Sequence, residues 1–146
     1  METGKIIERL KERGIRITKI RQLMVAVLLD SQKPLTANEI IAKLSSQSSK
    51  ANKTTVYREL DFLEKENIAL KVRLADGETR YEPAGLEHHH HLFCLKCKKI
   101  NPIKLETRAC AMESEPVAGG FRVLGHSIEL FGLCAKCQNI NSRQIT

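Results

Sequence analysis

The spacing of apolar residues divides the chain into a first part with helical periodicity and a second part with strand-like alternation. Apolar residues recur at three- and four-residue intervals in four segments, which predict four helices. Gly14 should end the first helix, Thr18 should cap the second, and Thr36 and Glu39 should form a capping box at the third. The fourth helix is expected over residues 53–67. The residues expected to face the core are Ile6, Ile7, Leu10, Ile20, Leu23, Met24, Val27, Leu28, Ile40, Ile41, Leu44, Val56, Leu60 and Leu63.

Two short β-prone stretches follow the helices, at residues 69–74 and 79–83. Asp76-Gly77 lies between them and is a strong signal for a hairpin turn. Helices followed by a two-stranded hairpin are typical of a winged helix-turn-helix domain.

The period changes after this hairpin, which predicts a second domain. We expect a winged helix domain over residues 1–82, a linker at 83–87 and a small α/β domain over 88–146. The predicted fold class is therefore α+β. In the second domain we expect strands at 88–94, 98–103 (broken by Pro102) and 121–134, with weak helical character at 104–114.

The positive charge is concentrated in the first part of the chain. The formal net charge is +7, and residues 1–58 hold 12 Lys and Arg against 5 Asp and Glu, whereas the remainder is balanced. A basic half favours a polyanionic partner such as nucleic acid, although a solvated basic surface would give the same charge. The longest apolar run, residues 23–29, is too short to span a bilayer, and the charged start resembles no signal segment. We therefore expect a soluble, cytoplasmic protein.

Four of the five cysteines form two Cys-x-x-Cys pairs, Cys94/Cys97 and Cys134/Cys137. Disulfides are not expected in an intracellular chain. Two such pairs favour a closed, structural zinc site with four thiolates. A redox pair is the alternative, but it would need only one pair in a thioredoxin-like context. Cys110 stands apart, and we expect it to be a small buried apolar residue.

Four consecutive histidines, residues 88–91, precede the first cysteine pair. The interior position of the run argues against a remnant of an affinity tag. On a strand, successive side chains point to opposite faces, so His88 and His90 would serve one site and the other two histidines a second site. His126 could join one pair and Glu82 the other. A solvated polar edge is the alternative, but the neighbouring cysteines favour metal ligation.

Several segments together resemble the ferric-uptake-regulator family of bacterial metal-dependent repressors, over nearly the whole chain. They are "GIRITKIR", "LTANEI", "KTTVYRELDFLEKENI", "HHHHLFCLKCKKI" and "GFRVLGHSIELFGLCAKC". The resemblance implies a DNA-binding winged helix, a C-terminal dimerisation domain and a homodimer on an inverted-repeat operator in double-stranded DNA. It implies that Arg16 enters a minor groove, that Tyr57 and Arg58 face bases, and that phosphates lie near Lys53, Thr54 and Thr55.

The same resemblance implies three metal sites. The structural zinc would be held by Cys94, Cys97, Cys134 and Cys137. A regulatory hinge site would use Glu82, His89 and His91. A second site would use His88, His126, His90 in place of the family's aspartate, and Glu106 or, less favoured, Cys110 in place of a carboxylate that falls near Ala109.

The hinge site departs from the family pattern. Lys33 and Pro34 stand where its histidine would fall, and Pro102 stands at a carboxylate position. The peroxide-sensing branch is disfavoured because it uses both missing groups. Imidazole or thiol in place of carboxylate favours zinc or nickel over iron or manganese, and "HSIELFGLC" resembles the zinc-uptake-regulator branch.

The sequence therefore predicts a repressor that controls metal homeostasis genes and responds to Zn²⁺. An iron-responsive repressor that binds Fe²⁺, and a constitutive DNA-binding protein with only structural zinc, are the alternatives. An enzyme is not expected, because the sequence has no HExxH motif and a four-thiolate shell leaves no open catalytic position.

Overall fold

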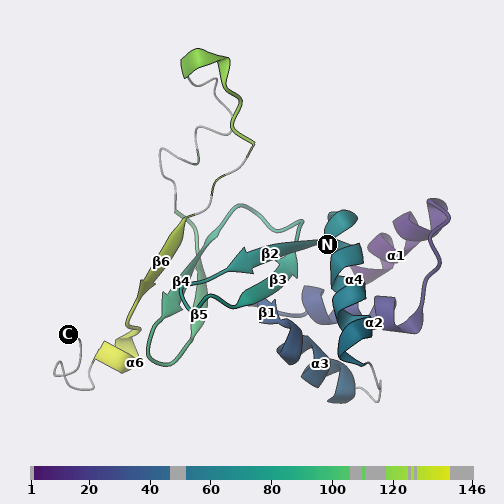
Figure 1. Ribbon diagram of the computed structural model, residues 1–146, viewed down its shortest axis with the longest axis horizontal. Helices are drawn as coiled ribbons and strands as arrows, with labels where there is room; N and C mark the ends of the chain where they lie inside the picture. Colours follow the sequence, from purple (N-terminus) through teal and green to yellow (C-terminus); the bar gives the residue numbers. More distant parts are fainter. Residues whose placement is uncertain are drawn as a thin grey trace. The chain divides into compact units, whose positions relative to one another are not determined.

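Helices make up most of the first of two units into which the chain divides, Met1–Glu87 and His88–Thr146. The structure is a computed structural model that describes residues 2–46, 52–105, 110, 118–124, 126 and 128–138. The first unit contains α1 (Thr3–Glu12), α2 (Lys19–Leu29), β1 (Leu35–Thr36), α3 (Ala37–Ser46), α4 (Lys53–Lys65), β2 (Ala69–Arg73) and β3 (Thr79–Pro83), as Figure 1 shows. The second contains β4 (His90–Cys94), β5 (Ile100–Ile103), the 3₁₀ turn η1 (Ala118–Gly120), β6 (Glu129–Gly132) and α6 (Ala135–Gln138). The predicted α+β fold class is confirmed.

The predicted caps form at the amino ends of α2 and α3. The Thr18 hydroxyl accepts a hydrogen bond from the backbone N–H of Arg21 at 3.2 Å. Thr36 and Glu39 form the reciprocal capping box: the Thr36 N–H donates to the Glu39 carboxylate at 2.8 Å, and the Glu39 N–H donates to the Thr36 hydroxyl at 3.2 Å. These bonds satisfy backbone donors that have no partner inside the helix.

The carboxyl ends of α1 and α4 share one stop motif. Gly14 (φ 73°) and Asn67 (φ 53°) adopt the left-handed conformation just after each helix. The N–H of the following isoleucine donates to the carbonyl five residues earlier, at 3.0 and 2.8 Å respectively. This is the Schellman arrangement, which satisfies the last helical carbonyls. It ends α4 at Lys65, two residues before the predicted end.

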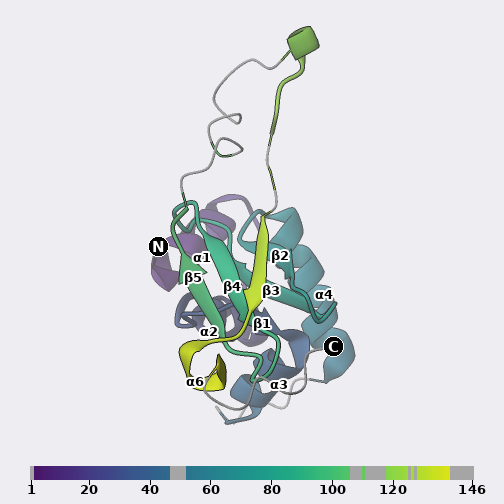
Figure 2. The same ribbon diagram turned by 90° about the vertical axis from the view of Figure 1, so that its left-hand side faces the viewer.

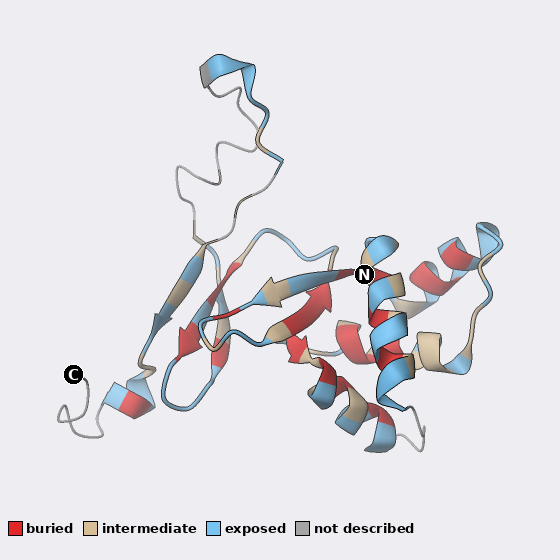
Figure 3. Ribbon diagram, viewed as in Figure 1, coloured by how far each residue is buried: buried red, intermediate tan, exposed pale blue. Residues whose placement is uncertain are grey.

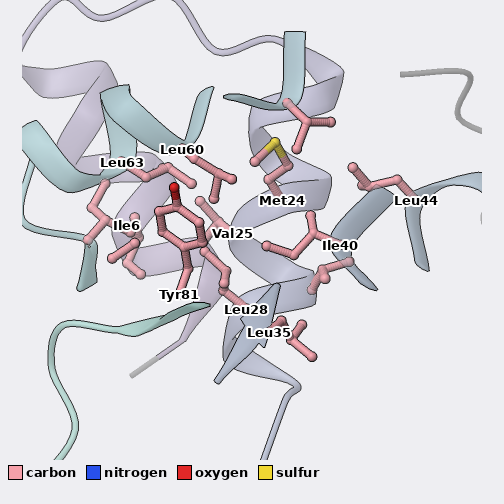
Figure 4. Close-up of a cluster of buried hydrophobic side chains, with 14 of the residues drawn as sticks. Ile6, Met24, Val25, Leu28, Leu35, Ile40, Leu44, Leu60, Leu63 and Tyr81 are labelled. Atoms are coloured by element: carbon pink, nitrogen blue, oxygen red, sulfur yellow. The ribbon is translucent and has the colours of Figure 1, made fainter. Parts of the chain in front are cut away.

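One apolar cluster holds the first unit together (Figure 4). Each helix of this unit has a buried side and an exposed side, as Figure 3 shows. Of the predicted core positions, Ile20, Leu23 and Ile41 are partly buried and pack against the cluster, and the others are buried. The ring of Tyr81 on β3 completes the cluster and was not among the predicted core residues.

The first unit also contains a three-stranded antiparallel sheet in the order β1-β3-β2. The hairpin forms as predicted, but the connection runs over residues 74–78 and is longer than a two-residue turn. Asp76 holds this connection, because its carboxylate accepts hydrogen bonds from the Glu78 N–H at 3.1 Å and from the buried Arg80 guanidinium at 2.8 and 2.7 Å. Strand β1 has only two residues and lies against β3, so local pattern did not predict it.

The second unit has a mixed sheet in the order β5-β4-β6, with β6 parallel to β4, and Figure 2 shows β6 alongside β4. Pro102 does not break β5, in contrast to the prediction, because β5 is an edge strand whose outer side needs no N–H donor. The long strand predicted at 121–134 is reduced to β6. Within that predicted stretch, the parallel pairing with β4 involves only residues 129–132, and positions 125 and 127 lie outside the described residues. Most of the segment 104–114 lies outside the described residues. Among the described helices none is long and apolar enough to cross a membrane.

Candidate metal centres and nucleic-acid interface

Four thiols converge in the second unit. Cys94 ends β4 and Cys97 lies in the following turn, while Cys134 immediately precedes α6 and Cys137 lies within it. Their four Sγ atoms all lie within 4.8 Å of one another, and the Cys97 and Cys134 sulfurs are 3.6 Å apart. Zn–S bonds of about 2.3 Å put two sulfurs of a tetrahedral ion about 3.8 Å apart. The thiols therefore fit a four-thiolate zinc, which would tie β4 to α6.

Local hydrogen bonds prepare this cluster for a cation. Backbone N–H groups of Cys97 and Cys134 donate to the Cys94 sulfur and lower the pKa of this thiol to about 6. The N–H of Cys137 lowers the pKa of Cys134 in the same way. Burial and the neighbouring sulfurs raise the pKa of Cys137 to about 12. Some thiols of the cluster are therefore ready to ionise, and the complete tetrathiolate requires a bound cation.

The histidine run separates into the two predicted pairs, although β4 begins only at His90 and not at His88 as predicted. The rings of His88 and His90 are 4.8 Å apart between centroids, and the rings of His89 and His91 are also 4.8 Å apart. His126 joins the first pair, with its ring 4.7 Å from His88 and 5.2 Å from His90. Three imidazoles from two separate stretches of the second unit thus lie close together.

Cys110 completes this second cluster. Its Sγ lies 3.5 Å from Nε2 of His90 and 3.4 Å from Nε2 of His126. The expectation that Cys110 is a buried apolar residue is wrong, because the residue is partly exposed and its sulfur contacts two imidazoles. Glu106, which we favoured over Cys110 as a ligand, lies outside the described residues. Burial and the nearby His88 and His126 lower the pKa of His90, which keeps its ring neutral and able to bind a cation.

The residues predicted for the hinge site belong to different units. Glu82 is buried on β3 in the first unit, and His89 and His91 belong to the second. Lys33, which stands at the missing histidine position, donates to the Glu39 carboxylate at 2.6 Å. Pro102, which stands at the missing carboxylate position, pairs with His91 in the sheet.

The first turns of α4 carry most of the residues predicted to contact DNA. Lys53, Thr54, Tyr57 and Arg58 are exposed, and Thr55 is half-buried. They occupy the part of the helix surface outside the buried stripe of Val56, Leu60 and Leu63. The Lys53 ammonium lies 5.8 Å from the centre of the Tyr57 ring. The helix thus presents a polar, partly basic surface at its amino end, where anions bind favourably.

Arg21 connects this surface to the predicted minor-groove residue, and no local pattern in the sequence predicts this role. Its guanidinium donates to both carboxylate oxygens of Glu59 on α4, at 2.9 and 3.1 Å, and stacks 3.6 Å from the centre of the Phe62 ring. It also donates to the backbone carbonyl of Arg16 at 2.7 Å. Arg16 itself is exposed. Arg21 therefore fixes the segment of Arg16 relative to α4.

Comparison with known proteins agrees with this arrangement. The model of the ferric uptake regulator family matches residues 12–131. The ferric uptake regulation protein of Helicobacter pylori is 33% identical over an alignment of 140 residues that covers 91% of each chain. The structure of a Helicobacter pylori ferric uptake regulator, described as revealing three functional metal binding sites, has a TM-score of 0.78 at 30% identity and covers 97% of each chain.

A zinc-bound manganese uptake regulator has a TM-score of 0.68 at 30% identity, covering 87% of this chain and 96% of its own. These relatives are named for iron and manganese, so the zinc-uptake-regulator branch expected from the sequence is not confirmed. The family match covers most of the sequence, and the structural likeness spans almost all of it. The chain therefore belongs to the ferric uptake regulator family of metal-responsive transcription regulators, as its motifs predict.

Proposed function

We propose that the chain is a homodimeric, metal-dependent repressor that binds an inverted-repeat operator and controls metal homeostasis genes, with Zn²⁺ as the favoured effector. Fe²⁺ is the alternative effector. The observation that carries this proposal is the cluster of His88, His90 and His126, which provides a second group of metal donors besides the four thiols. A second donor group gives the protein a site that can load and unload while the structural zinc stays in place.

The proposed contacts with DNA follow from the exposed surface of α4. Arg58 would hydrogen-bond a guanine edge, and Tyr57 would pack on a thymine methyl group in the major groove. Lys53, Thr54 and Thr55 would contact phosphates at the amino end of the helix. Arg16 would enter an electronegative minor groove beside the same half-site.

A homodimer is supported by exposed apolar side chains in the second unit. Leu124 is 85% exposed, Phe121 69% and Phe131 62%. Contiguous exposed apolar side chains mark interaction surfaces, and Phe121 and Leu124 belong to one described stretch, residues 118–124. Two copies that meet through this unit would present two α4 helices to half-sites one helical turn apart.

The metal would act by linkage. A ligand shifts a conformational equilibrium only as far as it binds one state more tightly than the other. We propose that the second cluster, together with Glu82, His89 and His91, binds metal more tightly in the conformation that binds DNA than in the conformation that does not. The assignment of the latter three rests on the family resemblance.

Zinc is favoured over iron because an imidazole, that of His90, stands where the family resemblance places a carboxylate. Iron(II) and manganese(II) prefer sites with carboxylate oxygens, whereas imidazole-rich sites suit zinc. A relative named for manganese uptake has been obtained with zinc bound, so the metal in a relative's name does not by itself fix the metal that the protein binds.

The test is operator binding by the full-length protein with its structural zinc retained, in the presence and absence of added Zn²⁺ or Fe²⁺. We expect the affinity to fall by about tenfold or more when a mild chelator removes only the second metal, a coupling of ordinary allosteric size. A double variant, His89→Ala with His91→Ala, should lose this response. Equal affinity in all states would instead support a constitutive DNA-binding protein with structural zinc only.

A further inference from the structure

We propose that Cys110 is a metal ligand, so that the second cluster is a site of three imidazoles and one thiolate. This inference deepens the proposed metal-dependent repression and rests on it for its regulatory meaning. The identity of the ligands, however, can be tested without DNA. The donor atoms are Nε2 of His88, His90 and His126 and Sγ of Cys110.

The spacing of the donor atoms fits one tetrahedral ion. Zn–N bonds of about 2.05 Å and a Zn–S bond of about 2.3 Å separate two nitrogens by about 3.3 Å and a nitrogen from the sulfur by about 3.6 Å. The Nε2 atoms of His88 and His90 are 3.2 Å apart, and the sulfur lies 3.5 and 3.4 Å from Nε2 of His90 and His126. All four donor atoms lie within 4.8 Å of one another. Each of these three separations is thus within about 0.2 Å of the corresponding edge of the tetrahedron.

The positions of the ligands follow from the local structure. His90 begins β4 and His88 lies in the bend two residues before it, and their rings lie 4.8 Å apart between centroids. The Cys110 thiol reaches them while donating to the backbone carbonyl of Leu105 at 3.4 Å. His126 approaches from the segment that leads into β6. The ligands therefore come from three separate stretches of the second unit, which a bound ion would fix relative to one another.

An ordinary hydrogen-bonded cluster explains the arrangement less well. Each neutral imidazole has one N–H donor and one acceptor nitrogen, and a thiol is a weak donor. The three Nε2 atoms and the Cys110 sulfur lie close together, and each of them can donate a lone pair to the same cation. Partial exposure of Cys110 also argues against a purely packing role, because a free cysteine that only packs is usually buried.

The donor set determines the class of metal. Four protein donors close a tetrahedral shell, and the combination of nitrogen with a soft thiolate suits zinc and disfavours iron(II) and manganese(II). The site would thus differ chemically from the four-thiolate cluster in the same unit. Cobalt(II) is a suitable probe, because it accepts the same tetrahedral shell and gives a thiolate-to-metal charge-transfer absorption only when sulfur is bound.

The experiment is a Co²⁺ titration of the full-length protein whose four-cysteine cluster has first been loaded with one equivalent of Zn²⁺. We expect a second equivalent, bound as Co²⁺, to produce tetrahedral visible bands and a charge-transfer band. Cys110→Ser should remove the charge-transfer band and weaken Co²⁺ binding by at least about tenfold, the loss caused even by changing a residue that only hydrogen-bonds a metal ligand. His88→Ala should keep the band and weaken binding, and Glu106→Gln, the matched control at the rival ligand position, should change neither.

Three results would overturn the proposal: no second equivalent of Co²⁺, Co²⁺ bound by the wild type without a charge-transfer band, or an unchanged band in Cys110→Ser. Loss of affinity in Glu106→Gln but not in Cys110→Ser would assign the site to a carboxylate. Retention of one Zn²⁺ per chain and an unchanged circular dichroism spectrum will show that each variant is folded. These readouts are independent of operator binding, so failure here leaves the proposed repression to its own test.

Discussion

Replacement of Arg21 by Met should both destabilise the first unit and weaken binding to the operator. Met preserves the length of the side chain and its contact with Phe62, but it removes the guanidinium from Glu59 and from the Arg16 carbonyl. The Arg21 and Glu59 side chains are only 11% and 14% exposed, so water replaces the lost hydrogen bonds poorly. The change therefore leaves a nearly buried carboxylate without its guanidinium.

The size of the effect can be estimated from these contacts. A hydrogen bond to a charged group contributes about 1.5–3 kcal/mol, and removal of one partner of a fully buried pair costs about 3–5 kcal/mol. The residual exposure lowers this range, and we expect a loss of about 2–3 kcal/mol. For a unit of this size each kcal/mol corresponds to roughly 4–8 °C, so the melting temperature should fall by about 10–20 °C.

The assay is thermal and urea unfolding of the full-length chain, followed by circular dichroism of the helices. A double-mutant cycle with Glu59→Gln should give a coupling energy of about 1–2 kcal/mol. Arg13→Met is the matched control, because Arg13 forms its ion pair with Glu66 while its own side chain is 55% exposed. Exposed pairs contribute less than about 1 kcal/mol. Equal losses in Arg21→Met and Arg13→Met, or a coupling energy near zero, would refute the reasoning.

Three further outcomes follow from burial and charge. Leu60→Ala should cost about 2–5 kcal/mol of unfolding free energy in a urea titration, because Leu60 is fully buried between the helices; a cost below about 1 kcal/mol would contradict the described core. Burial raises the pKa of Glu39, but the hydrogen bonds from Lys33 and from the Thr36 amide outweigh it, so the net pKa is lowered. The ionised Glu39 therefore stabilises the fold at pH values above the pKa that its carboxyl has in the unfolded chain. This stabilisation is lost as the pH falls through the lower pKa of the folded state. The stability difference between wild type and Glu39→Gln should therefore shrink below about pH 4, and a difference that grows on acidification would be inconsistent with it. Leu124→Glu should shift sedimentation toward monomer, because Leu124 is 85% exposed in the unit proposed to dimerise; an unchanged dimer would place Leu124 outside the interface.

The sequence predicted the first unit well because its signals are local. The caps at Thr18 and Thr36 and the stop at Gly14 depend on residues three to five positions away, and all three form. Features that depend on a distant partner were missed. Strand β1 exists only through β3, and the Arg21–Glu59 pair joins residues 38 positions apart in the sequence.

The same distinction explains what could be predicted about the metal centres. A Cys-x-x-Cys pair is a local signal, and alternation along a strand is enough to sort the histidine run into two pairs. Neither signal can say which residue from another segment closes a shell. Glu106 and Cys110 are close in sequence, so spacing alone allows either, and only the family resemblance favours the carboxylate.

The thiol of Cys110 has a consequence for the metal that is sensed. A site closed by a carboxylate would leave iron and zinc in competition, decided by their availability. A site closed by thiolate and three imidazoles instead favours zinc by its own chemistry, and the affinity of Cys110→Asp for Fe²⁺ relative to Zn²⁺ should then rise. The preference for zinc would in that case rest on one sulfur atom beside the three imidazoles of His88, His90 and His126.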